Sequence, residues 1–209
     1  MKFSTERPYL WLFATLAILG FIADQASKYV VFAKLDPSTP IYEVIPNYFD
    51  LRTNYTAEPF SSDSPLHFLR TISSDRVPHV NQGALFGLGA GWNTLFTIIS
   101  LAAAVFIIFW SSRPNVARDR FLCIALGLIL AGTLGNLYDR LVFGGVRDFL
   151  HCYYETHIWP DFNVADCCLV VGALSLLTHS FFVKDPSAEP AKTESAPATM
   201  QTTSPSNGM

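Results

Sequence analysis

The segment 121-FLCIALGLILAGTLGNLYDR-140 decides the fold of this chain. Residues 121–138 contain no charged side chain, and a helix needs about 20 mostly apolar residues, each rising about 1.5 Å, to cross the hydrocarbon core of a bilayer. Small residues recur every four positions at Gly127, Ala131 and Gly135, so one helix face allows another helix to approach closely. We therefore predict a membrane-spanning helix at about 121–138 that packs against other helices.

Three further stretches have a similar length and composition, at about 9–32, 92–110 and 164–183. Trp92 and Trp110 bracket the second of them, as aromatic residues do at the two interfaces of a bilayer. Half of the 209 residues are hydrophobic, 15% are charged and the mean hydropathy is +0.29, which is too apolar for a soluble domain of this length. The predicted fold class is an all-α integral membrane protein with four transmembrane helices.

Charges in the connecting segments predict the orientation. Arg113, Arg118 and Arg120 lie in the short link between the second and third helices, and cytoplasmic loops carry such an excess of basic residues. Both termini are then cytoplasmic, whereas the segments 33–91 and 139–163 face outward. The second of these outward segments carries only Arg140 and Arg147 as basic residues.

The polar segments differ in character. Residues 41–53, IYEVIPNYFDLRT, are rich in β-branched and aromatic side chains and predict strands, whereas about 54–78 is a polar insertion punctuated by proline. Residues 184–209 are rich in Pro, Ser, Thr and Ala, so burial cannot offset their ordering entropy. We expect one membrane domain at 1–183 followed by a disordered cytoplasmic tail.

Composition argues against several kinds of partner. The formal net charge of -3 and the lack of a basic run argue against a nucleic-acid partner, because such proteins neutralise phosphates with a basic patch. The four cysteines, at 123, 152, 167 and 168, show no CxxC spacing, and three of them fall in apolar segments. We therefore expect no metal, no cofactor and no disulfide.

Ionisable side chains inside the predicted spans need a specific reason, because each costs about 2.5 to 3.5 kcal/mol at a helix centre. Asp24 and Lys28 stand four residues apart on one face of the first helix and can neutralise each other. Asn136, Asp139 and Arg140 occupy the outer end of the third helix. An Asp–Arg pair that snorkels at the membrane boundary would account for the last two.

Carboxyl groups gather at the outward ends of three helices and in one outward loop. Asn163 and Asp166 open the fourth helix, where helix capping alone would explain them, but capping does not explain the gathering. Two close carboxyl groups can hydrolyse a peptide bond, because the ionised one activates water while the protonated one polarises the carbonyl. The spacing leaves four candidates for such a pair, namely Asp24, Asp139, Asp148 and Asp166.

Four motifs, read in order, resemble those of the lipoprotein signal peptidases, also called signal peptidase II. They are DQASK at 24–28, NQGALFG at 81–87, GNLYDRLVFGGVRDF at 135–149 and FNVAD at 162–166, and the likeness covers about 9–183. The resemblance implies four transmembrane helices, a small extracytoplasmic β-cradle and no metal. It also implies a multi-pass aspartyl endopeptidase of the bacterial cytoplasmic (inner) membrane with its active site at the outer face. Such an enzyme removes signal peptides from diacylglyceryl-modified prolipoproteins, just before the lipidated cysteine.

The resemblance implies roles for individual residues as well. Asp148 and Asp166 match the catalytic pair of the family. The positions that bind substrate or orient the aspartates are matched by Asn81, Gly83, Asn136, Arg140 and Asn163, and the supporting positions by Asp24, Lys28 and Asp139. The implied partners are diacylglyceryl prolipoproteins and membrane lipids, the implied inhibitor is the cyclic peptide globomycin, and we expect a monomer. One departure from the family pattern is the insertion at about 54–78, which precedes the motif at Asn81.

Other hypotheses fit the sequence less well. Rhomboid and zinc site-two proteases need a GxSx-type turn and an HExxH motif, and the sequence contains neither. Presenilin-like and prepilin peptidases need a GxGD motif, which is missing too. The alternative from another class is a small ion-coupled transporter in which intramembrane carboxylates relay protons. Such a relay should cross the bilayer, yet His179 is the main ionisable residue in the inner halves of the helices.

Overall fold

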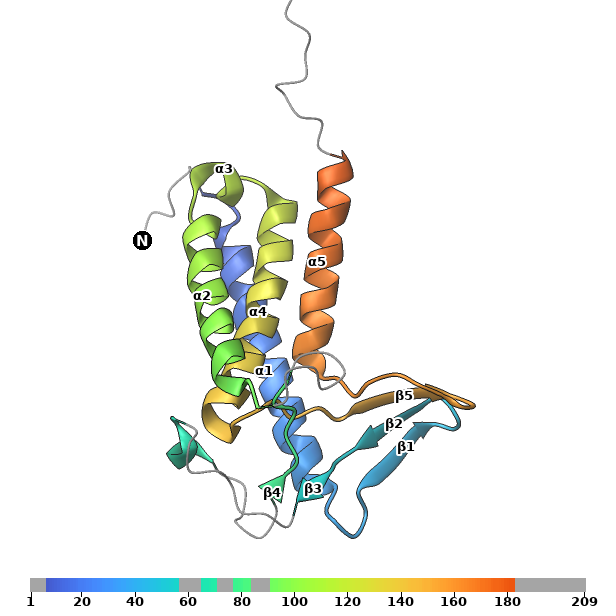
Figure 1. Cartoon of the computed structure of the whole chain (residues 1–209). Coiled ribbons are helices and arrows are strands. Elements are labelled where there is room, and N and C mark those ends of the chain that lie inside the picture. The colour runs from blue at the N-terminus through green and yellow to red at the C-terminus, as the bar shows by residue number, and fades with distance from the viewer. Residues whose placement is uncertain (1–6, 57–64, 71–76, 84–90, 183–209) are drawn as a thin grey trace, which may run out of the picture.

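The computed structural model describes residues 7–56, 65–70, 77–83 and 91–182. Four long helices lie side by side (Figure 1): α1 (Leu10–Lys34), α2 (Asn93–Ser111), α4 (Arg120–Phe143) and α5 (Val164–Phe182). Each is long and apolar enough to cross a membrane, which confirms the prediction of four such helices. The predicted disordered tail and residues 84–87 of the second motif lie outside the described residues.

α4 is the central helix of the bundle, and α1, α2 and α5 all contact it. Its apolar window is 56% buried, compared with 22% or less in the other three helices. A Cβ atom added at Gly127 would lie 2.8 Å from the carbonyl oxygen of Phe13, and one at Gly135 would lie 2.5 Å from the Asp24 carboxylate. The stripe of small residues therefore allows the close approach of α1 that the sequence predicted.

The ends of α4 are well defined. Asp119 caps its first turn by accepting hydrogen bonds from the backbone N–H groups of Phe121 (2.8 Å) and Leu122 (3.0 Å). At the other end Gly144 takes a left-handed conformation with φ of 78°. The helix ends at Phe143 and not at about 138 as predicted, because no glycine or proline interrupts residues 136–143 before Gly144. Asp139 and Arg140 lie within this helix, near the end at which the sequence placed them.

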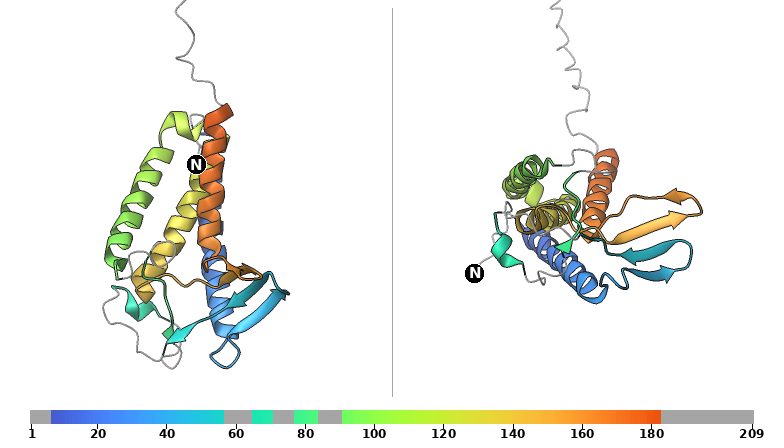
Figure 2. Two further views of the ribbon diagram at one scale, coloured as in Figure 1. Left: turned by 45° about the vertical axis from the view of Figure 1, so that its right-hand side comes forward. Right: turned by 60° about the horizontal axis from the view of Figure 1, so that its bottom comes forward.

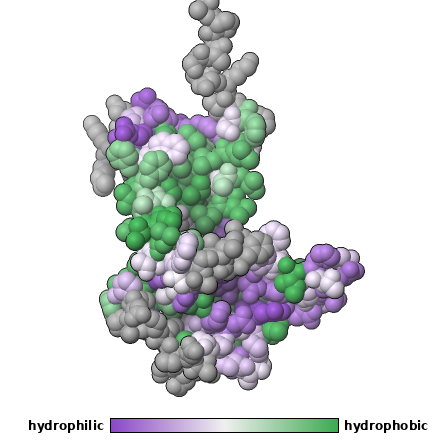
Figure 3. Space-filling model, viewed as in Figure 1, coloured by the Kyte–Doolittle hydropathy of each residue, from purple (hydrophilic) through white to green (hydrophobic). Residues whose placement is uncertain are grey.

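The surface of the helices is hydrophobic. Exposed side chains on α2 and α5 include Ile98, Val105, Phe106, Leu174 and Phe181. Figure 3 shows a hydrophobic band around the helices. The surface beyond it is hydrophilic at the end that carries the sheet and at the end that carries the short helix α3 (Pro114–Ala117). A soluble protein rarely exposes so large an apolar area, whereas lipid covers it in a membrane.

A four-stranded antiparallel sheet extends to one side of the bundle (Figure 2). Its order is β1 (Ile41–Ile45), β2 (Phe49–Arg52), β5 (Leu150–Tyr154) and β6 (His157–Ile158). The hairpin of β1 and β2 lies within the segment where strands were predicted. β2 pairs with β5, so the sheet joins the segment after α1 to the segment after α4. The expected small sheet is confirmed.

The insertion is closed at its base by two short strands. β3 (Tyr55–Thr56) pairs with β4 (Val77–Pro78), and the N–H of His79 donates a 2.8 Å hydrogen bond to the carbonyl of Asn54. The chain therefore returns after the insertion to the point where it left. Asn81 is placed beside the sheet end of α4 despite the intervening residues.

A one-turn 3₁₀ helix, η1 (His67–Leu69), packs on the end of α4. The N–H of Leu66 donates to the carbonyl of Leu141 (3.0 Å), and Nε of Arg70 donates to the carbonyl of Val142 (2.7 Å). The last carbonyls of a helix have no partner within the helix. The insertion thus supplies hydrogen bonds that stabilise the end of α4.

Candidate active site

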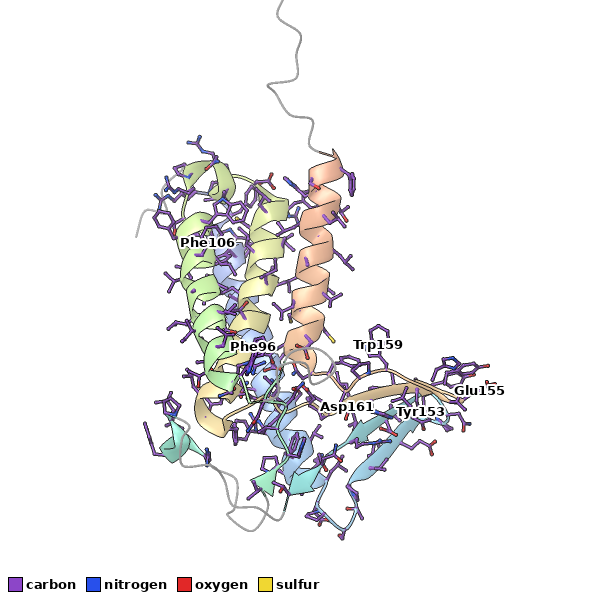
Figure 4. All side chains as sticks on the ribbon, viewed as in Figure 1. Phe96, Phe106, Tyr153, Glu155, Trp159 and Asp161 are labelled. Atoms are coloured by element: carbon purple, nitrogen blue, oxygen red, sulfur yellow. The ribbon has the colours of Figure 1, made fainter. Side chains whose placement is uncertain are left out.

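A cavity of about 780 Å³ lies where the sheet meets the ends of α4 and α5. In Figure 4, Trp159 and Asp161, which both line the cavity, lie between the sheet and the first turn of α5. Six of the ten site residues predicted from the sequence contribute to the lining: Asn81, Gly83, Asn136, Arg140, Asp148 and Asp166.

Asp148 belongs to the segment 144–149, which leads from α4 to the sheet. Its neighbours in the chain are held by backbone hydrogen bonds on both sides. Asn81 and Val146 exchange two of them, at 2.8 and 2.9 Å, and the N–H of Phe149 donates to the carbonyl of Phe162 at 3.1 Å. These contacts fix the main chain around Asp148 between the second and the fourth motif.

Asp166 lies in the first turn of α5, and Asn163 caps that helix. Oδ1 of Asn163 accepts a 3.1 Å hydrogen bond from the N–H of Asp166, and Oδ2 of Asp166 accepts one of 3.1 Å from the N–H of Asn163. This reciprocal arrangement is a capping box. The capping that the sequence predicted is therefore present, and it also orients the Asp166 carboxylate.

Two asparagine amides connect the two carboxyl groups, and a third is hydrogen-bonded to Asp148. Nδ2 of Asn163 donates to Oδ1 of Asp148 (2.7 Å) and to Oδ1 of Asn136 (3.2 Å). Nδ2 of Asn136 in turn donates to Oδ1 of Asp166 (2.8 Å), and Nδ2 of Asn81 donates to Oδ2 of Asp148 (3.1 Å). Residues from three of the predicted motifs thus form one hydrogen-bonded group around Asp148 and Asp166.

The surroundings of Asp148 favour its protonated form. Burial is the largest effect, and together with the negative charge of Asp166 it raises the pKa of the Asp148 carboxyl to about 7. Hydrogen bonds from the amides of Asn81 and Asn163 and the positive charge of Lys28 act in the opposite direction. Within the described part of the chain, neither Asp148 nor Asp166 takes part in a salt bridge. The two groups can therefore share one proton near neutral pH.

Asp24 and Asp139 lie behind this pair, in ion pairs. Nζ of Lys28 is 2.8 Å from Oδ2 of Asp24 and 3.4 Å from Oδ2 of Asp139, and Nη2 of Arg147 is 2.8 Å from Oδ1 of Asp139. All four side chains are fully buried. The ion pair predicted for Asp24 and Lys28 is confirmed. The geometry thus separates the four candidate aspartates into two that are neutralised by cations and two that are not.

Arg140 and Gly83 form a further part of the cavity wall. Nη2 of Arg140 donates to the carbonyl of Gly83 (2.8 Å), Nη1 donates to Oδ1 of Asn93 (3.3 Å), and the guanidinium lies 5.1 Å from the centre of the Phe96 ring. The N–H of Gly83 donates to Oδ1 of Asn81 at 3.0 Å, so Nδ2 of that amide is directed to Asp148. Arg140 therefore ties α2, α4 and the second motif together beside the cavity.

Sequence reasoning missed two members of the site. Arg147 was counted only as a charge of the outward loop, yet its side chain is fully buried against Asp139. Nε2 of Gln25 donates to Asp24 (2.9 Å) and to Asp139 (3.2 Å) and so connects the two buried carboxylates. Both residues fall within the quoted motifs, at 24–28 and 135–149, but arginine and glutamine are usually exposed, so the sequence provided no reason to expect their burial.

All four cysteines are free thiols. Among the residues that the structure describes, no group of three or more His, Cys, Asp and Glu side chains is placed to hold a metal ion.

Comparison with known proteins identifies the family. The family model described as signal peptidase (SPase) II matches residues 65–182. The lipoprotein signal peptidase of Rhodopirellula baltica is 38% identical over 184 residues, which cover 81% of this chain and 71% of the relative. That of Cellvibrio japonicus is 31% identical over 84% of this chain and 89% of the relative. The chain belongs to the signal peptidase II family. It is therefore a protease and a multi-pass membrane protein, and the transporter alternative is not supported.

Solved structures share the fold of this signal peptidase II family member. A bacterial membrane enzyme determined by the in meso method at 2.3 Å resolution aligns with a TM-score of 0.62 and 24% identity, over 89% of this chain and 96% of the other. A second such structure, at 1.9 Å resolution, aligns with a TM-score of 0.61 and 23% identity, over 85% of this chain and 97% of the other. Both structures thus share the overall fold of this chain.

Proposed function

We propose that this chain is an aspartyl endopeptidase that removes signal peptides from prolipoproteins, with Asp148 and Asp166 as its catalytic pair. One observation carries the proposal: the two carboxyl groups line one cavity and are connected through Asn163 and Asn136, and in the described residues neither has a cation partner. The substrate class is supported by the relatives, which are lipoprotein signal peptidases.

The arrangement suits general acid–base catalysis. The ionised carboxylate accepts a proton from a water molecule, whose oxygen attacks the scissile carbonyl carbon. The protonated carboxyl donates a hydrogen bond to the carbonyl oxygen and stabilises the negative charge that develops there. The tetrahedral intermediate then collapses, a proton passes to the leaving nitrogen, and the C–N bond breaks. The two carboxyl groups titrate as a coupled pair, so their two pKa values belong to the pair and not to either residue. Burial increases the difference between the two pKa values.

The other site residues orient this pair and the substrate. The amides of Asn81, Asn136 and Asn163 hold the carboxyl oxygens at fixed positions. Arg140 and Gly83 supply polar groups on the cavity wall that can bind the substrate backbone. The supporting residues Asp24, Lys28 and Asp139 form the buried ionic group behind the pair.

We further propose that cleavage occurs just before a diacylglyceryl cysteine, at the outer face of the bacterial cytoplasmic membrane. The hydrophobic band of the helices ends where the sheet begins (Figure 3), and the cavity lies at this boundary with an apolar wall of Leu169, Val170 and Val171. A substrate anchored by its own helix and acyl chains can reach such a site laterally. The lipid would then contribute much of the binding free energy.

The test is cleavage of a purified diacylglyceryl prolipoprotein by the purified enzyme in lipid–detergent micelles. Asp148→Asn and Asp166→Asn should each lower the rate by roughly 10³-fold or more while the protein stays folded, because each carboxyl acts only as half of a pair. Asp139→Asn should lower the cleavage rate less, because it only weakens the positioning of the pair. As a control, Asp36→Asn, in the turn after α1, should cleave at the wild-type rate. Globomycin should inhibit the wild-type reaction.

Two results would contradict the proposal in different ways. Wild-type enzyme that leaves the lipidated substrate intact would overturn the function. A folded Asp148→Asn variant that cleaves at the wild-type rate would overturn the choice of the pair.

A further inference from the structure

We propose that Arg147 is a positioning residue that fixes Asp148 of the proposed catalytic pair, by tying the segment 144–149 to the buried ionic group of α1 and α4. The inference rests on the function proposed above.

The side chain and the backbone of Arg147 both form hydrogen bonds with residues of α1 or α4. Nη2 donates to Oδ1 of Asp139 (2.8 Å) and to Oε1 of Gln25 (3.0 Å), and Nε donates to Oδ2 of Asp139 (3.2 Å). The backbone N–H of Arg147 donates to the same Oδ2 at 2.9 Å. One carboxylate therefore holds both the side chain and the main chain of the residue that precedes Asp148.

Two aromatic rings complete the site of the guanidinium. Its central carbon lies 4.0 Å from the centre of the Phe143 ring and 4.5 Å from that of Tyr29. Nη1 is buried and has no hydrogen-bond partner within the described residues. The attraction between the guanidinium cation and the faces of the two rings partly compensates for the missing hydrogen bond. Because Tyr29 and Gln25 belong to α1 and Phe143 and Asp139 to α4, Arg147 joins three segments at one point.

This tie complements the other contacts that locate Asp148. Val146 is bonded to Asn81 and Phe149 to Phe162, so the main chain is held on both sides of the catalytic candidate. Without the guanidinium the segment would keep the backbone hydrogen bond from residue 147 to Asp139, but it would lose the side-chain hydrogen bonds to Asp139 and Gln25. A displacement of a reacting group by about 1 Å is enough to lower a rate on the order of 100-fold.

Arg147 also balances the charge behind the pair. The fully buried group contains two carboxylates and two cations, so loss of Arg147 leaves one net negative charge close to Asp148. A nearby negative charge favours the protonated form of a carboxyl. The charged groups around Asp148 and Asp166 are Asp24 and Lys28 of α1, Asp139 and Arg140 of α4, Arg147, and Asp161, which lines the same cavity and is hydrogen-bonded to His151 at 2.6 Å.

The first test measures kcat, KM and the pH dependence of cleavage in Arg147→Met and Arg147→Lys. Arg147→Met keeps much of the volume but has neither charge nor donors. Its kcat should fall on the order of 100-fold with little change in KM, and the pH above which the rate declines should move upward. Arg147→Lys restores the charge but not the planar fork. It should regain the wild-type pH dependence and only part of the rate.

Arg147→Met leaves Asp139 with one cation fewer in a buried site, and an uncompensated buried charge is strongly destabilising. A second variant therefore keeps the test valid if Arg147→Met does not fold. In Arg147→Met combined with Asp139→Asn both charges are absent, which buried sites tolerate better. We expect this double variant to fold, to show a wild-type pH dependence, and to have a kcat well below that of Asp139→Asn alone. Arg113→Met, at an exposed position of the opposite end, is the matched control and should equal wild type.

The outcomes separate this inference from the proposed function. A folded Arg147→Met variant, or a folded double variant, with wild-type kcat would overturn the positioning role while leaving the catalytic pair in place. A rate that falls only in proportion to the folded fraction, with no change in pH dependence for Arg147→Met, would also overturn it. Failure of the proposed function would show instead as an inactive wild type.

Discussion

Asp139 and Asp148 belong to one sequence motif, yet their surroundings differ. Asp139 is buried, but it contacts Lys28 and Arg147, and these two cations stabilise its ionised form. Asp148 contacts two asparagine amides and faces the cavity. An amide stabilises an ionised carboxyl less than a cation does, so Asp148 is the one of the two that can hold a proton at neutral pH.

Cleavage should therefore decline as the pH rises above about 7, the pKa of the Asp148 carboxyl. Since this pKa is raised from the ordinary 3.8, the folded state holds the proton more tightly than the unfolded state. The associated stability is fully present below 3.8 and is lost as the pH rises through about 7.

The measurements are initial rates and thermal unfolding temperatures across this pH range. The unfolding temperature of the wild type should decrease as the pH is raised from 3.8 to about 7. In Asp148→Asn this decrease should be smaller. A rate that stays level up to pH ~9 would contradict a proton-sharing pair.

At the scale of the helices, the contact between α4 and α5 determines where Asp166 lies. A Cβ atom added at Gly132 would come within 2.3 Å of the carbonyl oxygen of Ala165 and 2.7 Å of Cγ of Leu169. The N–H of Ala165 also donates to Oδ1 of Asp24 at 2.9 Å. The start of α5 is thus held against both α4 and α1, directly beside Asp166.

Gly132→Ala should push α5 away from α4. Because the contact involves the backbone of α5, we expect the free energy of unfolding to fall by about 1 to 3 kcal/mol. The cleavage rate should fall with it, and both are measured in the same micelles. Leu177→Ala, at an exposed position of α5, should leave both unchanged. An unaltered unfolding temperature in Gly132→Ala would show that the two helices are not held this closely.

In the molecule as a whole, the sheet lies at one end of the helix bundle and α3 lies at the other (Figure 1). The cavity lies at the end that carries the sheet. Arg113, Arg118 and Arg120 flank α3, and basic residues are concentrated on the cytoplasmic side of membrane proteins. This charge distribution supports the proposed outward position of the sheet.

Single-cysteine labelling tests this orientation. In a chain whose four native cysteines are replaced by alanine, Glu155→Cys, which lies in the turn between β5 and β6 (Figure 4), should react with a membrane-impermeant maleimide in intact spheroplasts. Ser112→Cys, next to α3, should react only after the membrane has been opened. The reverse pattern would contradict the outward sheet.

The sequence by itself determined the four helices, because a long apolar run can satisfy its backbone within a bilayer only as a helix. It also predicted the strands at 41–53, and its motifs selected six residues that line one cavity. The extension of α4 to Phe143 was missed, since helix ends depend on local breakers more than on the apolar run.

Tertiary structure alone decided which aspartates are paired with cations and which line the cavity without a cation partner among the described residues. Arg147 and Gln25 are 122 residues apart in sequence but share a hydrogen bond, and Asp24 meets the N–H of Ala165 across 141 residues. The motif resemblance selects Asp148 and Asp166, and their catalytic role stays a prediction. The physical reason is that burial and the nearest opposite charge set the protonation of a carboxyl, and both depend on distances in space that no local pattern contains.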